Sequence, residues 1–97
     1  MRYRAILAPG AEDDINGFAD EWMPCIARQL SALLDNPVTL SRPSFVPFEA
    51  AFQIHSFDCE FDDGVHVFRV MFRYGADEMT LHIYAIGHVH YWRQSDD

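Results

Sequence analysis

Three consecutive segments in the second half of the chain alternate apolar and polar residues, and this alternation restricts the fold more than any other feature of the sequence. The clearest segment is VHVFRVMFRY, residues 65–74. One side of it carries three large apolar residues: Phe68, Val70 and Phe72. Side chains of a strand point alternately to opposite faces, so the pattern predicts a strand with one buried face. The polar links Asp63-Gly64 and 75–78 predict hairpins that join the three segments into an antiparallel meander.

In the other two segments of the meander, the alternation has to be examined to predict which residues face the core. In AFQIHSFDCEF, residues 51–61, Phe52 and Ile54 share one side, and three later residues share the other: Phe57, Cys59 and Phe61. A regular strand cannot bury both sets on one face, so we expect a β-bulge near His55-Ser56. In the last segment, one alternate set is expected to face the core: Leu81, Ile83 and Ala85. The other set is expected to face away from it: Thr80, His82, Tyr84, Ile86 and His88.

The first third of the chain predicts one strand and two helices. RYRAIL, residues 2–7, alternates like a strand with one buried face. Residues 11–36 then carry apolar side chains at steps of three and four, which is typical of an amphipathic helix. Gly17 and Pro24 interrupt this stripe, because glycine weakens a helix and proline removes a backbone donor. Two short helices are therefore expected in place of one long helix.

These elements predict a single α+β domain. The chain has 97 residues, which is enough for one modest hydrophobic core, so we expect one domain over residues 1–97. The prolines of residues 37–48 predict a surface loop between the second helix and the meander. The fold class follows from the order β-α-α-β-β-β, with an antiparallel sheet packed on the two N-terminal helices.

This order of elements and three strings resemble the RelE/ParE superfamily of bacterial toxins from type II toxin–antitoxin pairs. MRYRAILAPGAEDDI resembles an opening strand that runs through a proline into an acidic first helix. FRVMFRY resembles the central strand, and LHIYAIGHVHYWR resembles a last strand that ends in a Gly-His pair, a tyrosine and a basic residue. The resemblance implies a fold with a concave sheet face. It also implies a partner, an antitoxin segment that wraps over the toxin and holds it inactive.

The resemblance further implies a catalytic set and two classes of activity. Some members cut messenger RNA on the ribosome, and ParE members poison DNA gyrase. Matched residue by residue, the catalytic set consists of Arg69, Arg73, His88 and Tyr91. A metal-independent endoribonuclease needs an acid or base, for which histidine is suited, and cations that hold the phosphate, for which arginine is suited. Strand parity predicts that Arg69, Arg73 and His88 share one face of the sheet.

The charge of the chain opposes part of this interpretation. The net charge is −8 with fifteen acidic residues and no lysine, whereas the ribonuclease toxins are usually basic. An acidic surface repels phosphate backbones, so RNA and the ribosome are disfavoured as partners. The alternative function is that of a catalytically inactive, diverged member that acts as a protein-binding module. In that case Arg69 and Arg73 are solvated residues that pair with acids, and His88 is an ordinary polar residue at a strand end.

We expect neither a cofactor nor a metal. His88 and His90 point the same way on a strand, but His82 lies six residues before His88, roughly 20 Å away at about 3.3 Å per residue. No carboxylate is specified as a further ligand. The sequence also contains no glycine-rich phosphate loop and no nucleophile elbow.

The two cysteines and the hydropathy pattern bear on where the protein resides. Cys25 and Cys59 fit no zinc spacing and follow no secretion signal, so reduced, buried thiols are expected. No apolar run approaches the ~20 residues that a membrane span needs. We therefore expect a cytoplasmic protein with no membrane contact.

Overall fold

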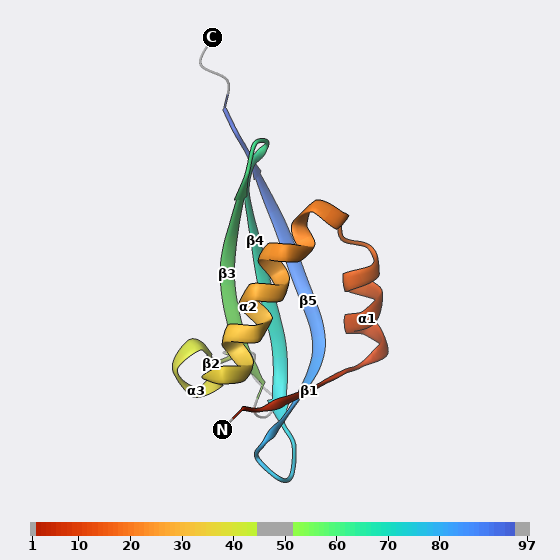
Figure 1. The fold of residues 1–97 in the computed structure, drawn as a ribbon, viewed down its shortest axis with the longest axis vertical. Coiled ribbons are helices and arrows are strands. Elements are labelled where there is room, and N and C mark those ends of the chain that lie inside the picture. The colour runs from red at the N-terminus through yellow and green to blue at the C-terminus, as the bar shows by residue number, and fades with distance from the viewer. Residues whose placement is uncertain (1, 45–51, 95–97) are drawn as a thin grey trace.

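The computed structural model describes residues 2–44 and 52–94, and within them five strands form one sheet in the order β1-β5-β4-β3-β2. The strands are β1 (Arg4–Leu7), β2 (Arg42–Pro43), β3 (Gln53–Phe61), β4 (Gly64–Tyr74) and β5 (Thr80–Trp92). The helical elements are α1 (Pro9–Asn16), the 3-10 turn η1 (Asp20–Trp22), α2 (Met23–Asp35) and the short α3 (Pro37–Leu40). The α+β class predicted from the sequence is confirmed (Figure 1).

The sheet is mixed, because its first strand comes from the far end of the chain. β3, β4 and β5 form the predicted antiparallel meander. β1 pairs with β5 in parallel, from Arg4 opposite Thr80 to Leu7 opposite Ile83. A parallel neighbour requires a connection that crosses over the sheet, and the helices between β1 and the meander provide it.

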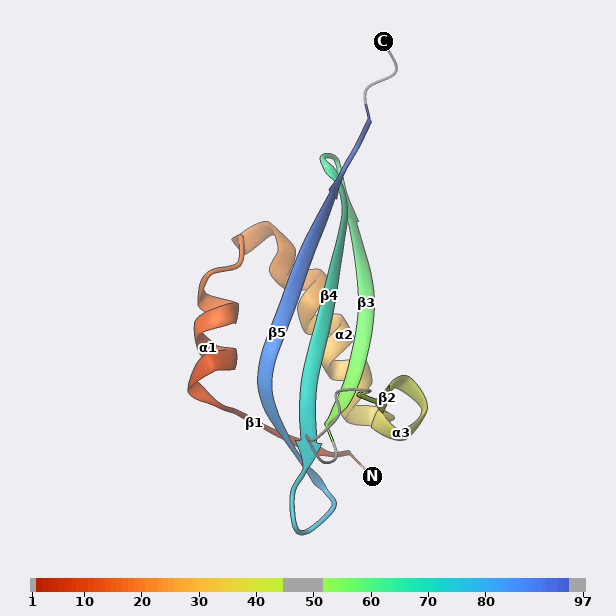
Figure 2. The same ribbon diagram turned by 180° about the vertical axis from the view of Figure 1, so that it is seen from behind.

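The helices divide at the predicted interruption and cover one face of the sheet. α1 ends before Gly17, and α2 begins one residue before Pro24, which occupies its first turn, where a missing N–H costs little. α2 lies across the sheet in Figure 1, and Figure 2 shows the opposite face of β3, β4 and β5 without a helix over it. We call these the helix face and the open face.

α1 protects the edge of β5 beyond the end of β1. β1 pairs with β5 only as far as Ile83, so later N–H groups on that edge need other partners. The carboxylate of Asp14 accepts a hydrogen bond from the N–H of Ile86 at 2.8 Å. Gly10 allows the close approach of α1, because a Cβ there would lie 3.3 Å from the carbonyl oxygen of Tyr84.

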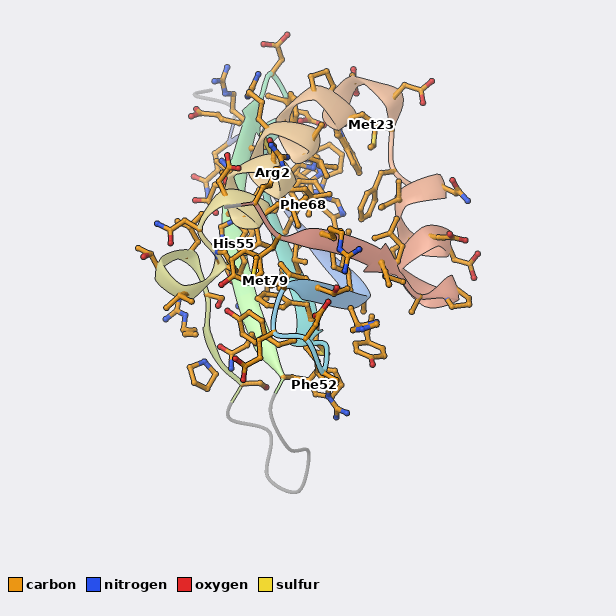
Figure 3. All side chains as sticks on the ribbon, turned by 60° about the horizontal axis from the view of Figure 1, so that its bottom comes forward. Arg2, Met23, Phe52, His55, Phe68 and Met79 are labelled. Atoms are coloured by element: carbon orange, nitrogen blue, oxygen red, sulfur yellow. A yellow bond between two sulfur atoms is a disulfide. The ribbon has the colours of Figure 1, made fainter. Side chains whose placement is uncertain are left out.

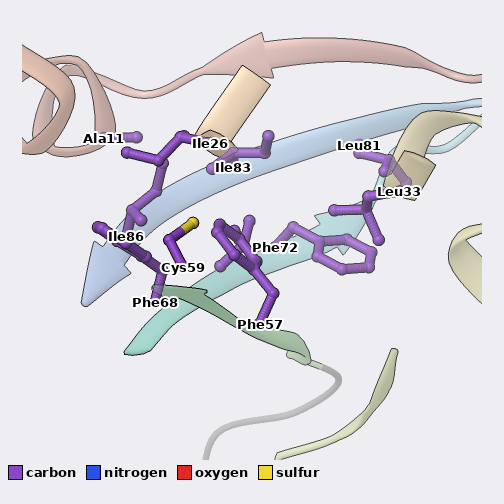
Figure 4. Close-up of a cluster of buried hydrophobic side chains, with 11 residues drawn as sticks. Ala11, Ile26, Leu33, Phe57, Cys59, Phe68, Phe72, Leu81, Ile83 and Ile86 are labelled. Atoms are coloured by element: carbon purple, nitrogen blue, oxygen red, sulfur yellow. The ribbon is translucent and has the colours of Figure 1, made fainter. Parts of the chain in front are cut away.

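The hydrophobic core lies between α2 and the meander. The predicted apolar side of β4 is fully buried, with Phe68, Val70 and Phe72 each at 0% exposure. Ile26 and Leu33 of α2 are also fully buried and belong to the same core cluster (Figure 4). No helix in residues 2–44 and 52–94 is long and apolar enough to cross a membrane.

Two local predictions in the first half of the sheet were wrong. The expected loop over 37–48 contains α3 and β2, and its residues 45–48 lie outside the described part of the chain. The expected bulge near His55-Ser56 is absent, because β3 pairs with β4 without a shift from Gln53 to Phe61. β3 keeps one phase since His55 itself occupies a buried position, at 5% exposure, with its Nδ1 3.0 Å from the carbonyl oxygen of Leu40.

The two cysteines form a disulfide, so the expectation of reduced thiols was wrong. Cys25 of α2 and Cys59 of β3 are joined across the core, with their Cα atoms 6.2 Å apart. Cys59 shares the buried phase of β3, and Cys25 faces the sheet from the first turn of α2. Sequence spacing cannot reveal such a pair, because the two residues meet only when the helix packs on the sheet. The cytoplasmic location stays a prediction without support from the cysteines.

Reduction of the disulfide is expected to lower the stability of the fold. The disulfide closes a loop with a sequence separation of 34 residues, for which the chain-entropy model gives about 4 kcal/mol. Urea unfolding with and without dithiothreitol should show this loss in free energy. The double variant Cys25→Ser/Cys59→Ser is the control, since dithiothreitol should not affect it. Equal unfolding midpoints for the wild type with and without the reductant would contradict the prediction.

Protonation of His55 is expected to oppose folding. Burial lowers the pKa of this imidazole below its ordinary value of 6.5, and the hydrogen bond with Leu40 offsets this in part. The unfolded chain then binds a proton more readily than the folded chain, so stability is lost as the pH falls below about 6.5. We expect urea unfolding to show this loss between roughly pH 7.5 and pH 5.5, and a smaller loss in His55→Phe. His82→Phe on the open face is the matched control, and an equal change in both variants would refute the role of His55.

Candidate functional site

A bulge between β4 and β5 decides which face the last residues of the sheet occupy. Met71 lies opposite Ala85 and Phe72 lies opposite Ile83, so Tyr84 is an extra residue on β5. One extra residue reverses the side-chain phase of everything that follows it. Ile86 is therefore buried at 2% exposure, and the residues of β5 that share its phase point to the helix face.

The bulge separates the residues that strand parity had grouped together. His88 lies opposite Phe68, which is buried on the helix face, whereas Arg69 lies opposite Gly87 on the open face. Partners across an antiparallel pair project to the same face. The prediction that Arg69, Arg73 and His88 share one face was therefore wrong for His88.

The three other predicted site residues lie on the open face but do not converge. The guanidinium of Arg73 stacks on Phe52, 3.9 Å from the ring centroid, and Figure 3 labels Phe52 at the lower end of the sheet. Arg69 is exposed and lines a shallow depression of about 270 Å³ together with Arg42. Tyr91, at 61% exposure, lies opposite Val65, eight residues along β4 from Arg73 and so roughly 26 Å away.

On the helix face, His88 belongs to a group of four polar residues that we call the histidine cluster: Asp63, His66, His88 and His90. His66 lies at its centre with 0% exposure. Its Nδ1 is 2.8 Å from His88 Nε2, and its Nε2 is 2.9 Å from Asp63 Oδ1. The ring of His90 stacks on His66, with 4.0 Å between centroids and 17° between planes. Both nitrogens of the buried imidazole are thus hydrogen-bonded.

Aromatic rings cover the histidine cluster. The indole of Trp22 lies 4.7 Å from the ring of His66 and 4.6 Å from that of His88, between centroids. Trp92 covers His90 at 3.8 Å. Trp22 ends the 3-10 turn between α1 and α2, so the helix interruption at Gly17–Pro24 places this ring over the histidines. The apolar cover reduces the access of water to the buried end of the cluster.

The β3–β4 turn holds Asp63 against the histidines. Gly64, the residue that follows, has a φ of 135°, a conformation that side chains with a Cβ rarely adopt. A Cβ at this position would lie 2.1 Å from the carbonyl oxygen of Tyr91. The N–H of Arg93 donates to the carbonyl oxygen of Asp63 at 2.8 Å, which ties the turn to the end of β5.

The charges of the cluster follow from these contacts. The hydrogen bond from His66 is the main cause that lowers the pKa of Asp63 below its ordinary value. Burial is the main cause that lowers the pKa of His88, and the neighbouring imidazoles of His66 and His90 act in the same direction. A charged carboxylate next to imidazole nitrogens is suited to pass a proton along the chain or to hold a cation. Within the described residues, no arginine side chain is hydrogen-bonded, ion-paired or stacked on the cluster.

Sequence reasoning missed His66 and Asp63 but had a signal for His66. His66 shares the phase of Phe68 in VHVFRV, so the predicted apolar face of the strand already contained a histidine. A buried histidine requires a polar partner. The partner of His90 lies across the hairpin, where His90 is opposite His66, and residue spacing along one strand does not reveal such a pair.

Substitution of Gly64 is expected to disrupt the cluster. Gly64→Ala combines an unfavourable φ with a Cβ that overlaps backbone atoms, for which we expect a loss of about 2 kcal/mol or more. Gly87→Ala is the matched control in the same strand pair, because a Cβ there would lie 4.0 Å from the carbonyl oxygen of Arg69, which is an ordinary van der Waals contact. Thermal unfolding of both variants checks the prediction, and equal melting temperatures would contradict it.

Known proteins resemble this chain in fold but not in sequence. No model of a known protein family matches the chain, and no curated protein matches it by sequence. The structure is similar to that of the RelBE2 toxin–antitoxin complex from Mycobacterium tuberculosis, with a TM-score of 0.65 and 13% identity, over 92% of this chain and 100% of that one.

Two further solved structures come from Escherichia coli. The intact RelBE toxin–antitoxin complex gives a TM-score of 0.58 at 9% identity, over 88% of this chain and 94% of that one. A mutant of the toxin RelE in the free state gives 0.61 at 9% identity, over 90% of this chain and 83% of that one. The chain therefore has a RelE-like toxin fold, as the order of its elements predicted.

Proposed function

We propose that this protein is the toxin-like component of a toxin–antitoxin-type pair and that it acts by binding a partner protein, without cutting RNA. The fold is that of toxins solved in complex with antitoxins. The observation that carries the proposal is the separation of His88 from Arg69 by the thickness of the sheet. An acid or base and a phosphate-binding cation must contact the same phosphate group, and residues on opposite faces cannot do so.

The open face has the composition of a binding surface. Two rows run across the sheet there, each from an acid on β3 through a valine on β4 to an exposed apolar residue on β5. The rows are Asp58–Val67–Val89 and Glu60–Val65–Tyr91. Val89 is 51% exposed and Tyr91 61%. Exposed apolar and aromatic side chains of this kind are typical of the centre of protein interfaces.

The charge of the chain indicates the chemistry of the partner. With a net charge of −8 and acids at one end of both rows, the open face favours a segment that carries apolar side chains flanked by lysine or arginine. Such a segment would pack on Val89 and Tyr91 and place its cations beside Asp58 and Glu60. An antitoxin encoded by the neighbouring reading frame is the first candidate.

A ribonuclease is the second candidate function, and one local feature favours it. Arg42 and Arg69 line the same depression on the open face, and Arg69 has no ion-pair partner among residues 2–44 and 52–94. Two guanidinium groups at one depression are suited to a phosphate. Catalysis there would need an acid or base other than His88, so the predicted catalytic set of Arg69, Arg73, His88 and Tyr91 would not operate as one unit.

Co-expression with the product of the neighbouring reading frame tests the binding function. We expect the two proteins to purify as a complex, and the double variant Val89→Asp/Tyr91→Ala to weaken it at least tenfold by isothermal titration, roughly 1.4 kcal/mol or more. Arg28→Ala on the exposed side of α2 is the matched control and should bind normally. Equal affinity of the wild type and the open-face variant would refute the proposed surface.

Assays of growth and RNA cleavage separate the two candidate functions. The wild type, Arg69→Ala and His88→Ala are induced in a bacterium without the partner, and each purified protein is incubated with messenger RNA and ribosomes. We expect no RNA cleavage by any of the three. Cleavage by the wild type that both substitutions abolish would contradict the proposal and restore the predicted catalytic set.

A further inference from the structure

We propose that Asp63, His66 and His90 bind one divalent transition-metal ion, of which Zn²⁺ is the representative, at the solvent end of the histidine cluster. The sequence predicted no metal site, because these three residues come together only across the β3–β4 turn and the β4–β5 pair. It lies on the helix face and is independent of the proposed binding function of the open face.

The three side chains already converge on one point. One ring nitrogen from each histidine and a carboxylate oxygen of Asp63 all lie within 4.8 Å of one another. Asp63 Oδ1 is 2.9 Å from His66 Nε2, and Asp63 Oδ2 is 3.7 Å from His90 Nε2. Nitrogen and oxygen ligands of a tetrahedral Zn²⁺ are about 3.3 Å apart. The rings of His66 and His90 are stacked, with 4.0 Å between centroids and 17° between planes, so binding requires one of the two rings to turn until both nitrogen lone pairs point at the ion.

The backbone that carries these ligands is well defined. His66 and His90 are direct cross-strand partners on β4 and β5, which sets the two imidazoles side by side. Gly64 and the hydrogen bond from Arg93 hold Asp63 at the adjoining turn. The side chain of Asp63 is 43% exposed and that of His90 is 15% exposed, so the site opens to solvent on one side. A water molecule can complete the coordination from there.

His88 supplies the outer contact that metal-binding histidines require. A ligating imidazole usually donates its second N–H to a fixed acceptor, which orients the ring. His66 Nδ1 lies 2.8 Å from His88 Nε2, and packing against Trp22 and Phe68 holds the ring of His88 in turn. The residue that family resemblance marked as catalytic thus acts here as a positioning residue for His66.

Metal binding reverses the direction of the hydrogen bond between these two histidines. Without an ion, His66 Nε2–H donates to Asp63, and His88 Nε2–H donates to His66 Nδ1. An ion on His66 Nε2 takes the place of that proton, so His66 carries its proton on Nδ1 and donates it to His88 Nε2. The proton displaced from His66 Nε2 leaves to solvent, the His88 Nε2 proton passes to His66 Nδ1, and solvent returns one proton to His88 Nδ1. Each ring therefore binds as many protons after the exchange as before it.

The ligand set indicates which ions bind. Two imidazole nitrogens and one carboxylate oxygen suit Zn²⁺, Co²⁺ and Ni²⁺, whereas Mg²⁺ and Ca²⁺ prefer sites made of oxygen alone. The carbonyl oxygen of Asp63, 3.2 Å from His90 Nε2, adds a further oxygen beside the site.

Titration of the full chain, freed of any purification tag and stripped with a chelator, tests the proposal. We expect one Zn²⁺ per chain by isothermal titration and by mass spectrometry under native conditions, and no binding of Mg²⁺. Asp63→Asn, in the exposed turn, and His90→Ala should each lower the Zn²⁺ affinity at least tenfold, and His88→Phe should lower it by about 10- to 100-fold. His82→Ala, on the open face, is the matched control and should bind as the wild type does.

Nitrogen-15 NMR of the histidine rings gives a second measure that a purely structural cluster would not change. One equivalent of Zn²⁺ should convert His66 from the Nε2–H to the Nδ1–H tautomer, and the converted fraction should be smaller in Asp63→Asn. Circular dichroism establishes that each variant is folded. Absence of Zn²⁺ binding by the wild type, equal affinity in Asp63→Asn and His90→Ala, or an unchanged His66 tautomer would overturn the proposal.

Discussion

The one-residue bulge at Tyr84 is the constraint on which the arrangement of both faces depends. Before it, β5 buries Leu81 and Ile83, and after it the strand buries Ile86 and turns His88 toward α2. Without the extra residue, Ile86 would face solvent, and His88 and His90 would lie on the open face. The bulge therefore buries Ile86, which would otherwise be exposed. It also places the polar side chains of His88 and His90 next to the core.

The cost of placing histidines next to the core is offset by hydrogen bonds and by aromatic packing. A buried imidazole without a partner is unfavourable by about 1–3 kcal/mol. His66 satisfies both of its nitrogens, one with His88 and the other with the charged Asp63. Trp22, Phe61 and Phe68 pack against the rings of His66 and His88. The end of the helix face near the β3–β4 turn is thus a polar extension of the core, closed by the indole of Trp22 from the break between α1 and α2.

The separation of the two faces also separates the functions that they support. The open face carries exposed apolar residues, acids and two arginines, which suit contact with another protein. The helix face carries a compact set of nitrogen and oxygen ligands at the end of the β3–β4 hairpin. Because β4 and β5 contribute alternate residues to both, a contact on the open face and an ion on the helix face act on the same two strands from opposite sides.

The sequence by itself determined the local elements. Period-two alternation located the strands of the meander, the Asp63-Gly64 and 75–78 links located the hairpins, and Gly17 with Pro24 located the helix interruption. These features depend on neighbours in the chain, so a pattern of residues reveals them. The RelE-like order of elements followed from the same patterns.

The tertiary structure alone decided the pairing of Cys25 with Cys59, the parallel position of β1 and the face to which His88 points. Each depends on how elements far apart in the sequence pack together. The bulge is the clearest case, because parity counted along one strand is reliable only while the register with its partner is unbroken. A single extra residue, favoured by the burial of Ile86, reassigned the histidine and with it the chemistry of the site.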